Sequence, residues 1–364
     1  MYKKAFVFKR KTLILLLIGL FTLSGCEHTG DYPIGADVNY TDEGINEGYT
    51  ETEDRAGTEN SETVVSFENT PKPLEAPVSM DAEDILYHST DDIDISLSMH
   101  RCKSDGENIY LVYGAAGELD LYSMPIGTDE HSQVNINNPE GMVICHIAID
   151  IYGNIHLLVA GNDYEEWFIW RLNENNQIEE ELDISDYFEI RQMPHWFLVD
   201  MDGTYYLQWV IGRDGVIVDS EGELKHRFTL ESLDTGWTYE AAVGKDGRIY
   251  LVYRGEDEKL EIGEFDVENC TIKREDSPLC FSRDEVFIEM SGGTDTNLLL
   301  FSPYSGVWAY DFKKGILENR VSLSDIGITR ATNFGPLTFL PDGRLLLLEK
   351  RGNDTYLRYI PAGK

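Results

Sequence analysis

Aspartates that stand beside or shortly before glycine recur along the chain, and carboxylates are the side chains that bind calcium. The recurring positions are Asp105, Asp150, Asp202, Asp246 and Asp342. A tight hairpin turn needs the same residues, because Asp accepts hydrogen bonds from the backbone that follows it and Gly accepts a positive φ. We therefore interpret these aspartates as turn residues. Calcium held elsewhere, near the centre of the fold, is the alternative.

No catalytic signature is present in the sequence. The chain has no G-x-S-x-G elbow, no H-E-x-x-H zinc motif, no paired C-x-x-C and no glycine-rich phosphate loop. Five histidines of the repeat region lack the regular short spacing of metal ligands: His100, His146, His156, His195 and His226. The sequence favours a protein without enzymatic activity. The alternative is a metal-assisted, calcium-type hydrolase or lyase that uses carboxylates at a channel mouth.

Aromatic and polar residues in the connections between predicted strands are the best candidates for ligand binding. Trp and Tyr rings beside polar neighbours stack on sugar rings or hold a peptide. The candidates are His195, Trp196, Trp237, Tyr239, Arg283, Asn333 and Tyr304. For Trp196 and Trp237 the alternative is a packing role between neighbouring units of the fold.

The elements that must position these residues form a repeat. Six apolar strands follow the turns and read NIYLVYG, NIHLLVAG, TYYLQWVIG, RIYLVYRG, NLLLFSPYSG and RLLLLEKRG. Five intervals separate Gly106 from Gly343, which gives about 47 residues per unit, the length of one propeller blade. The sequence predicts an all-β fold over residues 80–364, a six-bladed β-propeller of four-stranded antiparallel blades. Connections between blades, and those between the second and third strands, should emerge on one face, here called the upper face.

The two ends of the repeat region predict how the ring closes. The last repeat ends before a fourth strand can form, and the strand-like segment DILYHS, Asp84 to Ser89, precedes the first complete repeat. We expect this N-terminal segment to supply the outer strand of the last blade, which removes an open sheet edge. The alternative is an open array that another chain completes.

The first residues of the chain resemble an export signal. A cationic start precedes the apolar run Leu13 to Phe21, and Leu23-Ser24-Gly25-Cys26 follows, as in the lipobox of bacterial lipoproteins. The resemblance implies a signal peptide over residues 1–25 and a diacylglycerol on Cys26. Residues 26–79 are acidic and almost without apolar periodicity, which predicts a disordered tether after the lipidated cysteine.

Charge limits the expected partners. The sequence holds 30 Lys and Arg against 66 Asp and Glu, a formal net charge of −36. A surface this acidic repels nucleic acid and anionic lipid, so we expect no nucleic-acid ligand. The expected contacts are the membrane, through the lipid on Cys26, and a glycan, a peptide or a separate surface protein. We expect a monomer.

Cysteine positions predict free thiols. Four cysteines follow Cys26, namely Cys102, Cys145, Cys270 and Cys280. Their places in the predicted strands separate them by more than the span of a disulfide. We expect all four to be unpaired.

Together, the lipobox and the strand repeats resemble the lipid-anchored β-propeller lipoproteins of bacteria, and the repeat style is similar to that of NHL and TolB-like six-bladed propellers. The resemblance covers the signal and residues 80–364. It implies a location at the cell membrane, on its extracytoplasmic face. We expect a binding or interaction module that recognises its partner through the upper face. A scaffold without a small ligand is a further alternative.

Overall fold

The computed structural model describes the backbone of residues 83–87 and most of residues 101–362. Within the second range the description omits 116–117, 140, 162–163, 188–193, 210–213, 230–232, 234–236, 256–258, 274–279, 282–287, 293–297, 312–313 and 330–332. The predicted signal peptide, Cys26, the tether and Arg283 lie outside the described residues. What is described is almost entirely β-strand, with one short 3-10 helix, η1 (Ser185–Tyr187). No helix in these ranges is long and apolar enough to cross a membrane.

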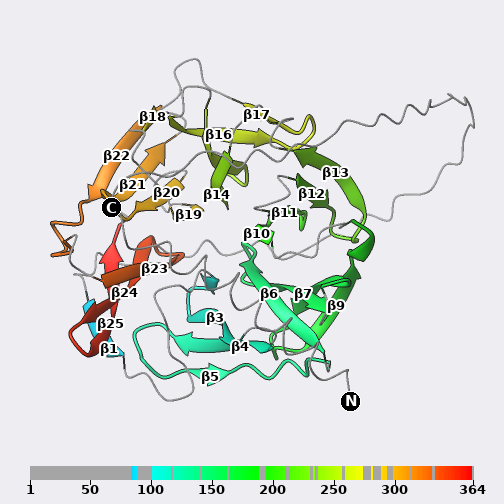
Figure 1. The fold of residues 1–364 in the computed structure, drawn as a ribbon, viewed down its shortest axis with the longest axis horizontal. Helices are drawn as coiled ribbons and strands as arrows, with labels where there is room; N and C mark the ends of the chain where they lie inside the picture. Colours follow the sequence, from blue (N-terminus) through cyan, green and yellow to red (C-terminus); the bar gives the residue numbers. More distant parts are fainter. Residues whose placement is uncertain are drawn as a thin grey trace, which may run out of the picture. The chain divides into compact units, whose positions relative to one another are not determined.

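The strands form six antiparallel sheets, here called blades 1 to 6 in chain order, and in blades 1 to 5 the strands follow one another in sequence (Figure 1). Blades 1 to 3 contain β2 (Cys102–Ser104), β3 (Asn108–Ala115), β4 (Glu118–Pro125) and β5 (Ser132–Gln133); β6 (Met142–Ile149), β7 (Ile155–Gly161), β8 (Trp167–Leu172) and β9 (Ile178–Asp183); and β10 (Pro194–Val199), β11 (Tyr205–Trp209), β12 (Asp214–Val218) and β13 (Leu224–Thr229).

Blades 4 to 6 follow the same plan, with one irregular outer strand. They contain β14 (Trp237–Val243), β15 (Ile249–Arg254), β16 (Leu260–Asp266), β17 (Thr271–Lys273) and β18 (Cys280–Phe281); β19 (Glu289–Gly292), β20 (Leu298–Ser302), β21 (Gly306–Asp311) and β22 (Ile316–Val321); and β23 (Asn333–Phe339), β24 (Arg344–Arg351), β25 (Asp354–Pro361) and β1 (Glu83–Tyr87). In blade 4 both β17 and β18 pair with β16, so two short strands share the outer position.

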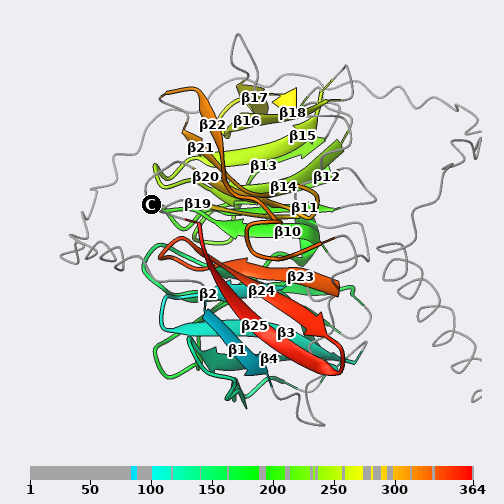
Figure 2. The ribbon, with the colours of Figure 1, turned by 90° about the vertical axis from the view of Figure 1, so that its left-hand side faces the viewer.

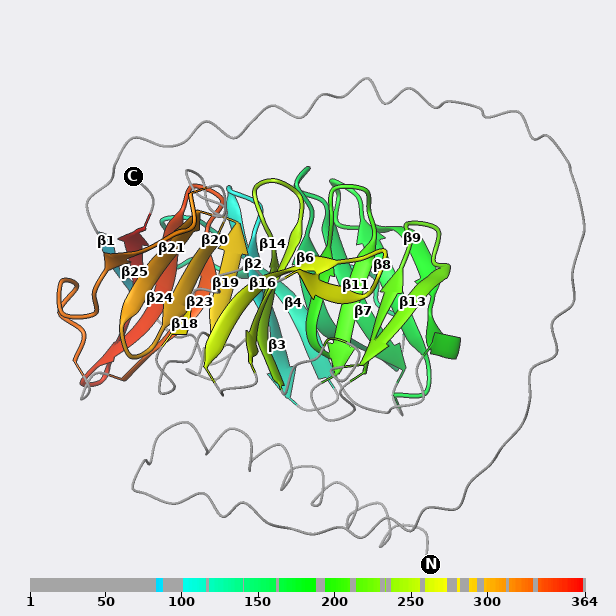
Figure 3. The ribbon, with the colours of Figure 1, turned by 90° about the horizontal axis from the view of Figure 1, so that it is seen from above.

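The innermost strands close a ring. Contacts between them run from β2 to β6, β10, β14, β19 and β23 and back to β2. Figure 3 shows this part of the molecule edge-on, with the strands crossing its thickness. The predicted six-bladed propeller of four-stranded blades is confirmed.

Each seam between neighbouring blades holds its own apolar core, so the described residues contain six such clusters. In the seam between blades 2 and 3, Leu158 packs with Phe197 and Leu207, and all three are fully buried. Every residue of the second strand β7 is buried, because a neighbouring blade covers each of its faces. The outer strand β9 instead alternates between exposed and half-buried residues. This is why the second strands are the apolar runs that repeat in the sequence.

The N-terminal strand closes the ring as predicted. β1 pairs antiparallel with β25, from Glu83 opposite Tyr359 to Tyr87 opposite Thr355. Figure 2 shows the blue β1 alongside the red β25. The strand begins one residue before the predicted segment. It ends at Tyr87, and Ser89 lies outside the described residues. The outer edge of blade 6 is thus covered by a segment some 270 residues away in sequence, by the numbering of β1 and β25.

Aspartates hold the hairpin turns, with one correction. In blade 3 the turn carboxylate belongs to Asp200 rather than Asp202, since Oδ1 of Asp200 accepts hydrogen bonds from the backbone of Asp202 and Thr204, both at 2.9 Å. The second oxygen of Asp200 accepts from the Tyr206 hydroxyl at 2.7 Å. The carboxyl of Asp246 binds Tyr250 in the same way. Both oxygens thus serve the fold locally, as the turn interpretation requires.

Three of the four cysteines are described, and each is a free thiol. Cys102 and Cys145 are buried, and Cys270 is half-buried. The side chain of Cys280 lies outside the described residues.

Candidate functional site

The inner strands carry one residue each at the same level of the ring. In every blade this residue lies opposite the same position of the second strand, which is Val112 in blade 1 and Leu158 in blade 2. From blade 1 to blade 6 the residues are Arg101, His146, Trp196, Glu240, Glu289 and Gly335. Four of the six are titratable, and in blades 2 and 4 they interrupt largely apolar inner strands. Such residues are costly to bury, so their grouping at one level needs a physical account.

Three of these inner strands bulge just before this level. The extra residues are Cys145 in β6, His195 in β10 and Tyr239 in β14. A bulge bends the strand and redirects the side chains next to it. In β6 and β14 the residue after the bulge is His146 or Glu240, and in β10 it is Trp196. The same backbone device therefore positions polar groups in blades 2 and 4 and a packing residue in blade 3.

An ion pair crosses the interior of the ring. Lys103 Nζ on β2 lies 3.4 Å from Glu289 Oε1 on β19. These strands are not neighbours, because β23 lies between them in the ring, so the pair spans the space inside the inner strands. The Lys103 side chain is 29% exposed and that of Glu289 is 12% exposed. Water therefore reaches the lysine end of this pair.

Glu240 joins this pair from β14. The pKa of Glu240 is raised to about 8, mainly by burial and also by the negative charge of Glu289, and Lys103 opposes both effects. Burial likewise raises the pKa of Glu289, against the effect of Lys103. For Lys103 burial acts to lower the pKa, but the two carboxylates outweigh it and the pKa is raised. The three groups thus share a poorly solvated site in which the lysine stays charged and Glu240 holds a proton at neutral pH.

Blades 1 and 2 supply the remaining polar groups of the axis. His146 is 7% exposed, and burial, followed by the charge of Arg101, holds its pKa well below the ordinary value. Its imidazole is therefore neutral. The Arg101 guanidinium donates a hydrogen bond to the backbone carbonyl of Cys145. Burial raises the pKa of the Cys145 thiol to about 12, which leaves it protonated and unreactive as a nucleophile.

The charges of the axis are segregated. Arg101 and Lys103 are both on blade 1, whereas Glu240 and Glu289 are on blades 4 and 5. Blade 4 lies opposite blade 1 in the ring of six blades, and blade 5 lies next to blade 4. The axis therefore has a cationic wall and an acidic wall. Such a site can orient a ligand that carries both signs of charge.

The carboxylates do not form a metal site within the described ranges. These ranges contain no group of three or more His, Cys, Asp or Glu side chains that could hold a metal ion. The calcium that the sequence left open near the centre thus has no ligand set among them.

The structure disperses the candidates named from the sequence. Trp196 is 3% exposed and stacks on Phe228, with ring centroids 6.2 Å apart, in the core between blades 3 and 4. His195 is half-buried beside the axis, and its charge influences His146. Tyr304 is 60% exposed in the turn between β20 and β21. Trp237, Tyr239 and Asn333 lie in inner strands, and their side chains are outside the description.

Lys103, His146, Glu240 and Glu289 were missed as a group by sequence reasoning. The available signal was a polar residue inside an apolar first strand, as in MVICHIAI and WTYEAAV. This signal becomes specific only when the strands are aligned on their register with the second strands. Bulges shift that register by one residue, so counting from the glycines misaligns the inner strands.

Comparison with known proteins identifies no family. No family model matches the sequence, and no curated protein matches it. Among solved structures the chain is similar to a streptogramin B lyase, with 12% identity, a TM-score of 0.47 and coverage of 77% of this chain and 87% of the lyase. It is also similar to YCF48 bound to D1 peptide, with 12% identity, a TM-score of 0.45 and coverage of 78% and 97%.

A third similar structure is virginiamycin B lyase from Staphylococcus aureus, with 10% identity, a TM-score of 0.45 and coverage of 77% of this chain and 99% of the lyase. At these identities the likeness concerns the fold alone. The strand pairing and the ring of contacts establish that fold independently: the chain is a six-bladed β-propeller with titratable side chains gathered at its axis.

Proposed function

We propose that this protein is a lipid-anchored cell-surface lipoprotein that binds its partner at the propeller axis, reached through the upper face. The observation that carries the proposal is the ion pair between Lys103 and Glu289, which spans the ring and remains partly exposed to water. Inside a blade seam such a pair would be replaced by apolar residues at little cost or with a gain in stability. Its place at the axis is instead where a ligand can meet it.

The cationic and acidic walls favour a ligand with an ammonium and a carboxylate group. Arg101 and Lys103 would receive the carboxylate and the charged Glu289 would receive the ammonium, in place of the Lys103–Glu289 ion pair. The protonated Glu240 would accept a hydrogen bond from the ammonium through its carbonyl oxygen. A free peptide end has this pattern, so among the partners that the sequence suggested, a glycan, a peptide or a surface protein, we favour a peptide. The axial groups are already poorly solvated, which reduces the further desolvation that binding requires.

A thermal-shift experiment on the full chain in detergent tests the ligand. The probes are Ala-Ala with free ends, Ala-Ala blocked at both ends, and a chitin-type oligosaccharide. The free dipeptide should raise the melting temperature, by the equivalent of about 2.7 kcal/mol at a hundred times its dissociation constant. The blocked peptide should not. Equal stabilisation by both peptides, or by neither, would contradict the charge-based proposal.

Matched variants connect this binding to the axis. Lys103→Met should abolish the shift, because the cationic wall loses its exposed member. Lys314→Met removes an exposed lysine that pairs with Asp311 at 2.6 Å on the rim of blade 5, and it should bind as the wild type does. Loss of binding in both variants would mean that the overall charge of the protein, rather than the axis, attracts the peptide.

The anchor is tested separately in cells. Metabolic labelling with an alkyne fatty acid should label the wild type, and Cys26→Ala should be unlabelled and released from the membrane fraction. Cys270→Ala is the matched control, since it removes a half-buried thiol of the propeller and should leave labelling intact. A labelled, membrane-bound Cys26→Ala variant would overturn the lipoprotein proposal without affecting the axial site.

A further inference from the structure

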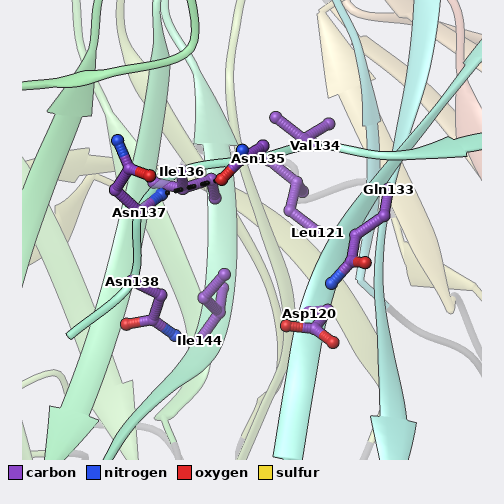
Figure 4. A pocket seen from close by; sticks show the side chains of 9 residues that line it. All are labelled: Asp120, Leu121, Gln133, Val134, Asn135, Ile136, Asn137, Asn138 and Ile144. Atoms are coloured by element: carbon purple, nitrogen blue, oxygen red, sulfur yellow. Dashed lines mark hydrogen bonds between the residues drawn. The ribbon is translucent and has the colours of Figure 1, made fainter. Parts of the chain in front are cut away.

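A pocket lies away from the axis, at the seam of blades 1 and 2. Its volume is about 270 Å³. The lining residues are Asp120 and Leu121 of β4, Gln133 of β5, the connecting residues Val134, Asn135, Ile136, Asn137 and Asn138, and Ile144 of β6. Figure 4 shows Asp120 and Gln133 on one wall and Asn138 with Ile144 on the other.

The pocket exists because the outer strand of blade 1 stops early. β5 pairs with β4 over only two residues, Ser132 and Gln133, whereas β9 and β13 are six residues long. After Gln133 the chain leaves the sheet and turns into the seam, where Val134 and Ile136 are buried at 8% and 4% exposure. Asn135, Asn137 and Asn138, which lie between and after them, line the pocket.

The connection from β5 to β6 is held in a defined conformation. Asn137 adopts a left-handed backbone, with φ of 52°, and its N–H donates to the Asn135 side chain at 3.3 Å (Figure 4). The Asn138 amide donates to the backbone carbonyl of Met142 at 3.0 Å. A left-handed non-glycine residue costs free energy and persists where the surroundings fix it. The amide groups are therefore positioned before any ligand arrives.

The chemistry of the lining selects a class of ligand. Four side-chain amides and one carboxylate offer donors and acceptors, and no Lys or Arg is among the lining residues. Leu121, Ile136 and Ile144 add an aliphatic surface. A pyranose ring presents this combination, because its hydroxyls donate and accept while its C–H face is apolar. The volume lies near the lower end of the usual range for small-molecule pockets, about 300 Å³.

We propose that the pocket between blades 1 and 2 is a binding site for a single neutral sugar residue, distinct from the axial site. Asp120 would accept hydrogen bonds from two adjacent hydroxyls, and the amides of Gln133 and Asn138 would fix the orientation of the ring. An anionic sugar would be repelled by Asp120. The site lies on a blade connection of the upper face, so a sugar bound there leaves the axis open.

Saturation-transfer NMR on the full chain in detergent tests this site, with glucose, galactose, N-acetylglucosamine and glucuronate as probes. At least one neutral sugar should receive saturation, and glucuronate should not. Asp120→Ala should weaken the binding of that sugar about tenfold or more, as expected for the loss of hydrogen bonds to a charged group. Gln133→Ala, at an exposed position, should weaken it less.

Two controls separate this proposal from the axial one. Asn175→Ala removes an exposed amide from the turn between β8 and β9 and should bind sugar as the wild type does. Lys103→Met should also leave sugar binding unchanged. The proposal is overturned if no neutral sugar in the panel binds, if Asp120→Ala binds as the wild type does, or if Lys103→Met abolishes sugar binding.

Discussion

The hairpin turns and the propeller axis both contain acidic side chains, yet the two regions use them differently. At a turn, Asp200 accepts hydrogen bonds from residues two, four and six positions later. At the axis, Glu289 pairs with Lys103, which lies 186 positions earlier in the sequence. A carboxylate of the first kind acts within one hairpin, and one of the second kind requires the closed ring.

Electrostatics separates the same two regions. At the turn of blade 2, burial acts to raise the pKa of Asp150, but hydrogen bonds from His156 and Asn154 outweigh it, so the pKa is lowered. At the axis, burial raises the pKa of Glu240 to about 8. The turn favours a charged carboxylate and the axis a protonated one. The turns therefore act as structural connections, whereas the axis keeps polar groups in a state that a ligand can change.

The largest effect should come from pH. Folded Glu240 keeps its proton up to about pH 8, whereas the unfolded chain releases it above the ordinary value of 4.5. The stability that goes with protonated Glu240 is therefore present at low pH, and it is lost as the pH rises from about 4.5 to about 8. The free energy of unfolding should fall by up to about 1.4 kcal/mol per pH unit in that window. Urea denaturation at intervals from pH 5 to 8 measures the slope.

Two variants decide whether this slope belongs to the axis. Glu240→Gln should flatten it, since the amide does not titrate. Asp150→Asn should lower the free energy of unfolding at neutral pH but leave this slope unchanged. It should alter the pH dependence only in acid, because a lowered pKa stabilises the fold above the ordinary value of 3.8 and this contribution is lost as the pH falls. A slope that persists in Glu240→Gln would show that other groups cause it.

Removing the lysine of the axis should cost about 2 kcal/mol at neutral pH, because Glu289 is left in a poorly solvated site without its partner. Lys314→Met breaks an exposed pair, in which the lysine is 67% exposed, and should cost less than about 0.5 kcal/mol. Urea denaturation of Lys103→Met and Lys314→Met makes the comparison. Equal costs would mean that the axial pair behaves as an ordinary surface pair.

Loss of a turn carboxylate should have a smaller effect, of about 1 kcal/mol. Asp200→Ala removes acceptors for two backbone groups and for Tyr206, which is 2% exposed. Asp202→Ala, three residues before the start of β11, should change stability by less than about 0.5 kcal/mol because its side chain is exposed. Thermal melting ranks the two variants. A larger loss in Asp202→Ala would reverse the assignment of the turn residue.

Most of the fold was predictable because its repeated features are local. The apolar second strands are buried on both faces, and a run such as Ile155 to Gly161 shows this directly in the sequence. The fourth strand of blade 6 was predictable from the incomplete last repeat. The short β5 and the divided outer strand of blade 4 were not predicted, since no turn residue marks where a strand leaves its sheet.

The candidate site was much less predictable. Trp196 was selected as an aromatic residue in a connection between predicted strands, but the structure places it in a blade seam. This selection passed over Lys103, Glu240 and Glu289, which are single polar residues in separate repeats. The place of Glu240 depends on a bulge in β14 whose position the sequence does not reveal, because a bulge adds one residue without a characteristic motif. Tyr304 is accessible, but it stands on a turn of blade 5 outside the axial group.

The sequence by itself determined the number of blades, the turn chemistry and the strand that completes the ring, because each depends on residues near one another or on the count of repeats. Only the tertiary structure decided which charged residues meet. Lys103 and Glu289 are far apart along the chain, and the residues around each of them do not indicate which partner it will have. Closure of the ring brings them together, and the poorly solvated interior then sets the protonation of their neighbour Glu240.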